Sequence, residues 1–426
     1  MTGSPTARER GGMTGWGFAV AALLAPPLAF PSAKAMVPLL FLAVAWEAAA
    51  RFRRGGAIPV PSARVLWPLA ALLGWALAST LWSVDPARSI RVSLTIAATC
   101  GTGALGIALA RALGGVERRR IGTALLVGIA VSAVLFAIEF MTNAGLHFAL
   151  RGAIDRLLGR MPEPLYPIDY RFVLNNGATV VAVLGWPAAV AGWRCYGWPG
   201  AAAAIAVTAA VTLPSDSAIA GVATIAGVVV LFLAAPLPRI AAPLLSAGMI
   251  GALLLMPLAV ELLPRPDRLA ERLPVMSDSA YHRLFVWKFA ADRVADRPLV
   301  GWGMDSARSV PGGEVELVTE KPLPDGRVIH TRGELLPLHP HNAALQLWLE
   351  LGAVGALLAA LFATRAVRVV AAAATSPFVR GAGLAQAAAA FLIAAAGYGL
   401  WQSWWLAALW LGAALYAALN AGERDG

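Results

Sequence analysis

The chain is dominated by apolar segments of about 20 residues, the length that an α-helix needs to cross the hydrocarbon core of a membrane. Counting these segments predicts about twelve spanning helices. Their centres fall near Leu23, Leu42, Leu73, Thr99, Ile129, Leu184, Val207, Ile225, Leu253, Leu351, Ile393 and Leu411. Only 14% of the 426 residues are charged, against about 25% in a soluble domain. The sequence therefore predicts an all-α polytopic membrane protein, with residues 1–426 forming a single domain within the lipid bilayer.

The short links between these segments alternate in their content of positive charge. Arginine occurs in every second link, in "RFRRGG", "RALGGVERRR", "WRCYGW", "PLPR" and "ATRAVRVV", whereas "FPSAK", "SVDPARS", "LPSDS" and "WQSWW" are poorer in Lys and Arg. Because Lys and Arg favour the cytoplasmic side, this alternation predicts that both termini are cytoplasmic. The net charge of +10 comes from these links rather than from a basic stripe on a soluble domain, so no nucleic-acid partner is expected.

Two longer connections then fall on the outer side. Residues 142–170 combine a short amphipathic pattern with a proline-rich extended stretch. Residues 264–340, between the ninth and tenth predicted spans, form the largest soluble element. In it, "DSAYHRLFVWKFAADRVADRP" predicts an amphipathic helix on or near the membrane that ends at Pro298. The alternation in "GEVELVTEKPLPDGRVIHTR" predicts a small β-hairpin around residues 324–326.

A polar series opens the tenth predicted span. His341 lies at the outer surface, where a hydrated histidine keeps a pKa near neutral and can act as a general base. Asn342, Gln346 and Glu350 are spaced by four residues and so share one helix face. Such a face is costly against lipid, so we expect it to point into the bundle or a wet cavity.

Gln346 and Glu350 have a second interpretation, as hydrogen bonds that hold neighbouring helices together. Gly352 and Gly355 support it, because glycines permit close helix approach. We favour this interpretation for the two side chains, and a functional role for His341.

Two arginines are candidates for binding an anion. Arg171 stands where the first outer loop enters the segment "RFVLNNGATVVAVLGWP". A charge at this depth is costly and often functional, although an interfacial anchor is the alternative. Arg283 lies on the amphipathic helix of residues 264–340, where the alternative is a solvated face. That loop holds eleven basic and eleven acidic residues, so an anion site there must be built from particular arginines.

Several signatures of other chemistry are absent from the sequence. It contains no P-loop, no GxGxxG opening a soluble α/β unit and no zinc-binding HExxH helix. "GWGMDS", residues 301–306, has the composition of a turn. Cys100 and Cys195 lack the spacing of a redox or metal site. We therefore predict no metal and no cofactor.

The stretch "HRLFVWKFAADRVADRPLVGWGMDS" and the later "HNAALQLWLELGAVGALL" resemble the O-antigen ligase and polymerase superfamily of bacterial envelope glycosyltransferases. In that family a loop-helix Arg precedes a Pro-x-x-Gly-x-Gly turn. A His-Asn pair then opens a helix with Gln and Glu-x-Gly. The resemblance implies that Arg171 and Arg283 bind the donor pyrophosphate, that His341 is the catalytic base, and that Asn342, Gln346 and Glu350 support the site.

The same resemblance implies an inner-membrane enzyme with a periplasmic active site. Its donor would be an undecaprenyl-pyrophosphate-linked glycan, and its acceptor lipid A–core or another glycan. Transfer would be inverting and metal-independent. Ligation of O-antigen to lipid A–core is the preferred expectation, and polymerisation of O-antigen or exopolysaccharide is the alternative. Two other classes stay open on the residues alone. They are a transporter, suggested by Glu139 and Glu350 inside spans, and a membrane scaffold.

Overall fold

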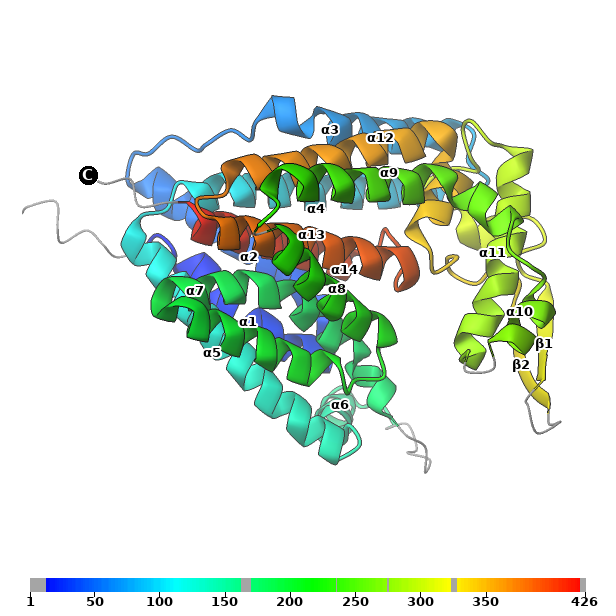
Figure 1. Ribbon diagram of the computed structural model, residues 1–426, viewed down its shortest axis with the longest axis horizontal. Coiled ribbons are helices and arrows are strands. Elements are labelled where there is room, and N and C mark those ends of the chain that lie inside the picture. The colour runs from blue at the N-terminus through cyan, green and yellow to red at the C-terminus, as the bar shows by residue number, and fades with distance from the viewer. Residues whose placement is uncertain (1–12, 162–169, 235, 274–275, 323–327, 422–426) are drawn as a thin grey trace, which may run out of the picture.

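The computed structural model describes residues 13–161, 170–234, 236–273, 276–322 and 328–421. It is a helical bundle with one small hairpin, so the predicted all-α class is confirmed (Figure 1). The helices are α1 (Trp16–Ser32), α2 (Met36–Arg53), α3 (Ala63–Ala78), α4 (Pro86–Arg111), α5 (Gly115–Met141), α6 (Gly145–Leu157), α7 (Asn175–Thr212), α8 (Ala218–Ala234), α9 (Pro238–Glu261), α10 (Pro266–Arg272), α11 (Asp278–Asp296), α12 (Ala343–Ala373), α13 (Pro377–Ala396) and α14 (Ser403–Asn420). The strands are β1 (Glu316–Pro322) and β2 (Val328–Glu334).

Polar caps mark where several of these helices begin. The side chains of Asp85, Ser277, Asn342 and Ser376 accept backbone N–H bonds at the starts of α4, α11, α12 and α13. The first four N–H groups of a helix have no partner inside the helix, so a cap of this kind fixes the starting residue.

Seven segments of the described chain are long and apolar enough to cross a membrane. They are Trp16–Arg53, Pro86–Arg111, Gly115–Met141, Arg171–Thr212, Arg239–Glu261, Ala343–Ala373 and Pro377–Ala396. Val65–Leu81 and Ala218–Ala234 are shorter apolar helices. Each of the twelve predicted centres lies on a helix, which confirms a multi-pass membrane protein. The number of crossings, and the side of the membrane that each end faces, stay predictions.

Two of these seven segments fold back on themselves. In α7 the helical geometry breaks at Gly197, which has a φ of 64°. Beyond it, Gly200 approaches Gly192 so closely that an added Cβ on Gly192 would lie 2.3 Å from the Gly200 carbonyl oxygen. In the same way α2 returns along α1, where a Cβ on Gly17 would lie 2.7 Å from the oxygen of Ala43. Small residues thus allow one sequence segment to supply two packed helices.

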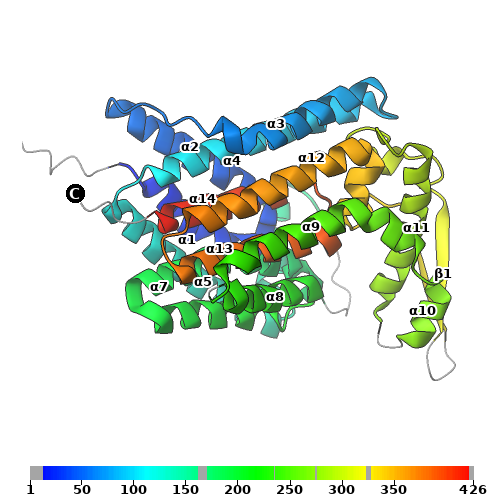
Figure 2. The ribbon, with the colours of Figure 1, turned by 45° about the horizontal axis from the view of Figure 1, so that its top comes forward.

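The first half of α7 forms the centre of the bundle. Every residue from Gly177 to Gly192 is buried, because α1, α5, α13 and α14 all pack against this helix. Helix α12 lies elsewhere in the bundle, between α9 and α3 (Figures 1 and 2). An all-apolar helix surrounded by other helices needs no polar face, which explains why α7 has no amphipathic pattern.

Residues 264–340 gather at one end of the bundle, opposite the bend of α7 (Figures 1 and 2). The predicted amphipathic helix is α11, which packs on α9 and α12. The predicted hairpin is also confirmed. β1 and β2 pair antiparallel with Glu316 opposite Glu334, and the predicted turn at 324–326 lies outside the described residues. The hydroxyl of Tyr281 donates to the Glu320 carbonyl at 3.1 Å, which ties the hairpin to α11.

The shorter of the two long connections contains α6, in agreement with its amphipathic pattern. Most of the proline-rich stretch after it lies outside the described residues. Glu139, near the end of α5, is buried, and its carboxylate accepts the Leu146 N–H at 3.1 Å. This acidic residue therefore holds the first turn of α6.

Candidate functional site

The site is organised by the link between α13 and α14, residues 397–402. Two consecutive carbonyl groups at its start each bind one of the predicted site residues. Arg283 donates from Nη1 to the Ala396 carbonyl at 2.7 Å. His341 Nδ1 lies 2.9 Å from the Gly397 carbonyl oxygen. Arg283 comes from α11 and His341 from the residue before the cap of α12, so this link joins two elements that are far apart in sequence.

The bond to Gly397 fixes the protonation pattern of His341. A carbonyl oxygen only accepts hydrogen bonds, so Nδ1 must carry the proton and Nε2 keeps its lone pair in the neutral ring. Burial lowers the pKa of His341 from 6.5, and the charge of Arg283 acts in the same direction, while the bond to Gly397 opposes them. The result is a neutral imidazole with a basic nitrogen at neutral pH, as a general base requires.

The backbone at His341 is strained, with a φ of 52°. Residues other than glycine seldom adopt this region, and they do so where the surroundings hold them there. Two contacts hold this turn. The indole of Trp287 donates to the Pro340 carbonyl at 2.9 Å, and the His341 N–H donates to His339 Nδ1 at 3.1 Å. The ring position of His341 is therefore set by α11 and by its histidine neighbour.

His339 has a structural role beside the candidate base. The Gly399 N–H lies 3.1 Å from its Nε2, while the His341 N–H faces its Nδ1. A doubly protonated ring would place N–H groups against N–H groups on both sides. Burial above all, with the nearby His341, Arg308 and Arg283, lowers the pKa of His339 to about 3. His339 is thus a neutral spacer between the turn and the 397–402 link.

Gln346 and Glu350 hold the other end of the link. Gln346 donates from Nε2 to Glu350 Oε1 at 3.1 Å and accepts the Leu400 N–H at 2.8 Å. Glu350 Oε2 accepts the Trp401 indole N–H at 2.5 Å and the Asp305 backbone N–H at 2.8 Å. Both side chains are buried, with Glu350 0% exposed. The predicted hydrogen-bonding role is therefore correct, and its partner is the very link that binds Arg283 and His341.

Asn342 acts on the same turn through the helix start. Its Oδ1 accepts the N–H groups of Ala344 and Leu345, each at 3.1 Å. This is the geometry of an N-cap, which determines where α12 begins and how the preceding residue enters it. Asn342 thus fixes the start of α12, and the cap places His341 one residue before it.

The glycines of the two motif stretches meet at a break in α12. Gly352 has a φ of 65° and interrupts the helix. The chain at 298–303 docks there: Trp302 N–H donates to the Leu349 carbonyl and Gly303 N–H to the Glu350 carbonyl, both at 2.8 Å. A Cβ on Gly301 would lie 2.4 Å from the Glu350 backbone carbon. Contact this close requires glycine.

This contact extends one interpretation from the sequence and corrects another. The turn predicted for residues 301–306 is present at Met304–Asp305, and the same segment also contacts α12 and presents the Asp305 N–H to Glu350. Gly352 was expected to let two helices approach. It instead lets a loop approach, because a Cβ on Gly352 would lie 2.3 Å from the carbonyl carbon of Leu299. The helix break and the loop are parts of one unit.

Arg171 is placed differently from the other two predicted residues. It opens a 3-10 helix, η4 (Arg171–Leu174), ahead of α7, and its guanidinium carbon lies 4.3 Å from the ring centroid of Phe140. Further along α7, the Thr179 hydroxyl lies 3.1 Å from the hydroxyl of Tyr398 in the 397–402 link. The structure thus brings Arg283 and His341 together at the 397–402 link, whereas Arg171 packs on Phe140 of α5.

Three residues of this network were missed by sequence reasoning. Trp401 and Tyr398 lie in a link that was read only as poor in positive charge. Asp305 has a φ of 53°, binds Arg88 Nε through Oδ2 at 2.6 Å and donates its N–H to Glu350. Burial raises the pKa of Asp305, and Arg88 opposes that shift. The only signal in the sequence was that Asp305 follows the paired glycines.

No group of three or more His, Cys, Asp and Glu side chains could hold a metal ion among the residues that the structure describes. The hydrogen-bonded network of the site is instead built from arginine, histidine, indole and amide groups, together with the carboxylates of Asp305 and Glu350. Such a set can bind an anion through Arg283 and accept a proton at His341 Nε2.

Comparison with known proteins finds a family that is similar to the region holding two of these residues. A family model described as O-Antigen ligase matches residues 201–360, which include Arg283, His341 and both glycine motifs. Over this region the chain is similar to the O-antigen ligase family. Arg171 lies outside the matched region. No solved structure matches this chain significantly.

Curated proteins similar to this chain come from Rickettsia. Proteins of Rickettsia prowazekii and Rickettsia conorii, each named "Putative polysaccharide ligase", are both 26% identical, over 295 and 309 residues. The alignments cover 68% and 72% of this chain, and 66% and 69% of the relatives. A protein of Rickettsia felis with the same name is 24% identical over 79% of this chain and 76% of its own. This chain therefore spans about two thirds to three quarters of these relatives.

Proposed function

We propose that this protein is an inverting, metal-independent glycosyltransferase that moves a glycan from undecaprenyl-pyrophosphate to an acceptor hydroxyl at the periplasmic face of the inner membrane. The acceptor is lipid A–core, which makes the reaction an O-antigen ligation. One observation carries the proposal. The carbonyls of Ala396 and Gly397 hold an arginine and a neutral histidine side by side, within the region that matches the family.

In the proposed reaction, His341 Nε2 takes the proton of the acceptor hydroxyl. The acceptor oxygen attacks the anomeric carbon from the face opposite the leaving group, and the bond from that carbon to the pyrophosphate oxygen breaks. The configuration at the anomeric carbon is thereby inverted. Positioned bases of this kind contribute about 10²- to 10⁴-fold to a rate. The tautomer set by Gly397 leaves Nε2 as the basic nitrogen.

The leaving pyrophosphate gains negative charge as the glycosidic bond breaks. Arg283 is placed to stabilise that charge, since an arginine offers forked N–H donors and a permanent positive charge. One of its nitrogens is bound to Ala396, which fixes the direction of the guanidinium. We assign Arg171 to the same donor, at the end of the site next to α5, where Phe140 supports its guanidinium.

Asn342, Gln346 and Glu350 are positioning residues in this proposal. They do not touch the substrates. Their hydrogen bonds hold the helix start and the 397–402 link, so that the carbonyls reach Arg283 and His341. Preorganised groups of this kind spend no energy on reorganisation as the reaction proceeds.

Ligation is preferred to polymerisation because the relatives carry the name of polysaccharide ligases. A transporter is disfavoured by the positions of the acidic residues that suggested it. Glu139 accepts a backbone N–H at the start of α6, and Glu350 is fully hydrogen-bonded inside the network. Neither carboxylate is thereby placed as a proton carrier at the middle of the bundle.

The proposal is tested by reconstituting the purified protein in liposomes with a lipid-linked glycan and lipid A–core, without an ion gradient. We expect glycosylated lipid A–core, seen as a shift on a gel, and an inverted anomeric linkage by NMR. Elongation of the lipid-linked glycan with lipid A–core unchanged would show a polymerase instead. Movement of glycan across the bilayer without a new linkage would show a transporter.

A further inference from the structure

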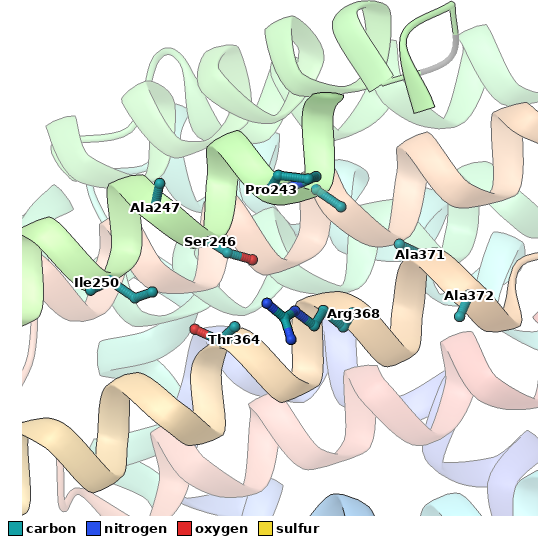
Figure 3. Close-up of a pocket in the computed structure, with 9 residues that line it drawn as sticks. Pro243, Ser246, Ala247, Ile250, Thr364, Arg368, Ala371 and Ala372 are labelled. Carbon is teal, nitrogen blue, oxygen red and sulfur yellow. The ribbon is translucent and has the colours of Figure 1, made fainter. Parts of the chain in front are cut away.

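A cavity of about 430 Å³ opens between α9 and α12 (Figure 3). It is lined by Ala242, Pro243, Ser246, Ala247, Ile250, Thr364, Arg368, Ala371 and Ala372. It lies near the first residues of α9 and the last residues of α12, far along α12 from His341. Both helices belong to segments that can cross a membrane. The cavity therefore lies near one membrane face, at the end of the bundle away from the candidate active site.

Ser246 contributes to this cavity a hydroxyl that has no hydrogen-bond partner in the described structure. The residue is 5% exposed, and its hydroxyl finds no hydrogen-bond partner among the described residues. Hydroxyls on apolar helices usually bond the carbonyl four residues earlier, as Thr364 does with Ala360 at 2.8 Å. A buried hydroxyl without a partner destabilises the folded protein. A ligand that accepts a hydrogen bond would remove that destabilisation.

Arg368 brings a positive charge to the same cavity. In Figure 3 its guanidinium extends from α12 into the space between α12 and α9, on the side where Ser246 and Thr364 lie. No ion pair or hydrogen bond of Arg368 is found in the described parts of the chain. Arg368 is exposed on the described chain, and an arginine between spanning helices that faces lipid needs a counter-charge. Among the residues that line the cavity, none is acidic.

Large apolar side chains on the same two helices, close in sequence to the lining residues, are exposed and form the apolar rim of the cavity in this proposal. Ile240 and Leu244 on α9 are 58% and 65% exposed, and Leu361 on α12 is 38% exposed. In a membrane these side chains would face acyl chains rather than water. The cavity thus combines a cation and a hydroxyl donor at one membrane face with an apolar surface that runs toward the bilayer centre. Basic pockets between spanning helices are typical sites for anionic lipid headgroups.

We propose that this cavity binds the headgroup phosphate of an anionic glycerophospholipid from the adjoining leaflet. The guanidinium of Arg368 and the hydroxyl of Ser246 bind the phosphate oxygens, and the acyl chains lie along α9 and α12. A soluble phosphate would make the same polar contacts but would leave the apolar rim unused. The site is independent of glycan transfer, because it shares no residue with the His341 network.

The test measures which lipid stays bound to the full-length protein. The protein is purified in detergent with equal amounts of phosphatidylglycerol and phosphatidylcholine, and native mass spectrometry gives the ratio of the two retained lipids. We expect phosphatidylglycerol to be preferred. Arg368→Gln should reduce that preference about tenfold, the usual effect of losing a charge-assisted hydrogen bond. Ser246→Ala should reduce it by less.

Arg365→Gln is the matched control, because it removes the same charge from the same helix outside the cavity lining. It should leave the preference within about twofold of the unmodified protein, since Arg365 does not line the cavity and surface ion pairs outside it contribute little. Arg368→Lys keeps the charge and should retain part of the preference. Equal losses for Arg365→Gln and Arg368→Gln would overturn the proposal, because only overall charge would then matter.

Two further results would overturn it. Displacement of phosphatidylglycerol by excess inorganic phosphate would assign the cavity to a soluble anion. A dimer that breaks on Arg368→Gln, with no change in lipid preference, would assign it to a second copy of the chain. Elution of each variant as a single monodisperse species, at the volume of the unmodified protein, checks that the variant is folded.

Discussion

Polar side chains at the two ends of α12 differ in whether they have hydrogen-bond partners. At the His341 end, Asn342, Gln346 and Glu350 are buried and hydrogen-bonded to fixed protein groups. At the other end, Arg368 and the facing Ser246 lack hydrogen bonds within the described structure. The difference separates two uses of polarity inside a membrane. Satisfied groups build a rigid frame, and unsatisfied groups beside a cavity indicate a ligand.

The largest effect should come from the proposed base that this frame presents to substrate. His341→Asn removes the base, while asparagine still tolerates the positive φ of this position. We expect transfer of glycan to lipid A–core to fall about 10²- to 10⁴-fold, with an unchanged melting temperature. His341→Ala should lose as much activity and some stability as well. Full activity in His341→Asn would refute the assignment of the base.

Breaking the frame itself should affect stability and activity together. Glu350→Ala leaves the Trp401 indole, the Asp305 N–H and the Gln346 amide without their acceptor. We expect the free energy of unfolding to fall by about 3 kcal/mol. We also expect kcat to fall with little change in KM, because the carbonyls that hold Arg283 and His341 lose their support.

Glu350→Gln tests whether the hydrogen bonds of this side chain, and not only its packing, position the base. Its amide oxygen can still accept from the indole, so kcat should recover in part relative to Glu350→Ala. If kcat in Glu350→Ala equals that of the unmodified protein, the frame does not position the base. Steady-state kinetics and thermal unfolding of both variants provide the two measurements.

The pH dependence of transfer should reflect the burial of His341. Its folded pKa lies below 6.5, so the ring stays neutral until the pH falls below that value. The acidic limb of kcat/KM should therefore lie below pH 6.5. Lowering the pH also decreases the stability of the native state. As pH falls below 6.5 the unfolded chain takes up a proton that the native His341 resists, so the native state loses stability. An acidic limb above pH 6.5 would contradict this picture.

The smallest effect should come from the helix cap. Asn342→Ala removes the acceptor of two backbone N–H groups, which costs about 1 kcal/mol. Asn342→Asp keeps an acceptor at the same place and serves as the control. Chemical denaturation in detergent would measure both. A cost near zero for Asn342→Ala would mean that packing, rather than the cap, sets the start of α12.

Much of the architecture follows from local sequence. The lengths of the apolar segments, the caps at Asp85 and Asn342 and the alternation in 316–334 place the helices and the hairpin. These features act over a few residues, so the sequence shows them directly. The motif containing Arg283 and His341 was also recognisable, because both stand in short patterns of the superfamily. The bend of α7 at Gly197 falls in the link "WRCYGW" that separates two predicted spans, while the number of membrane crossings stays a prediction.

What the sequence by itself determined was therefore a polytopic helical membrane protein and its set of candidate residues. Only the tertiary structure decided what those residues touch. It joined Arg283 and His341 through the carbonyls of Ala396 and Gly397, more than fifty positions away, and set the tautomer of the histidine. It also placed Arg368 opposite Ser246. Backbone carbonyls are the same in every residue, so only the folded chain shows which side chains they bind.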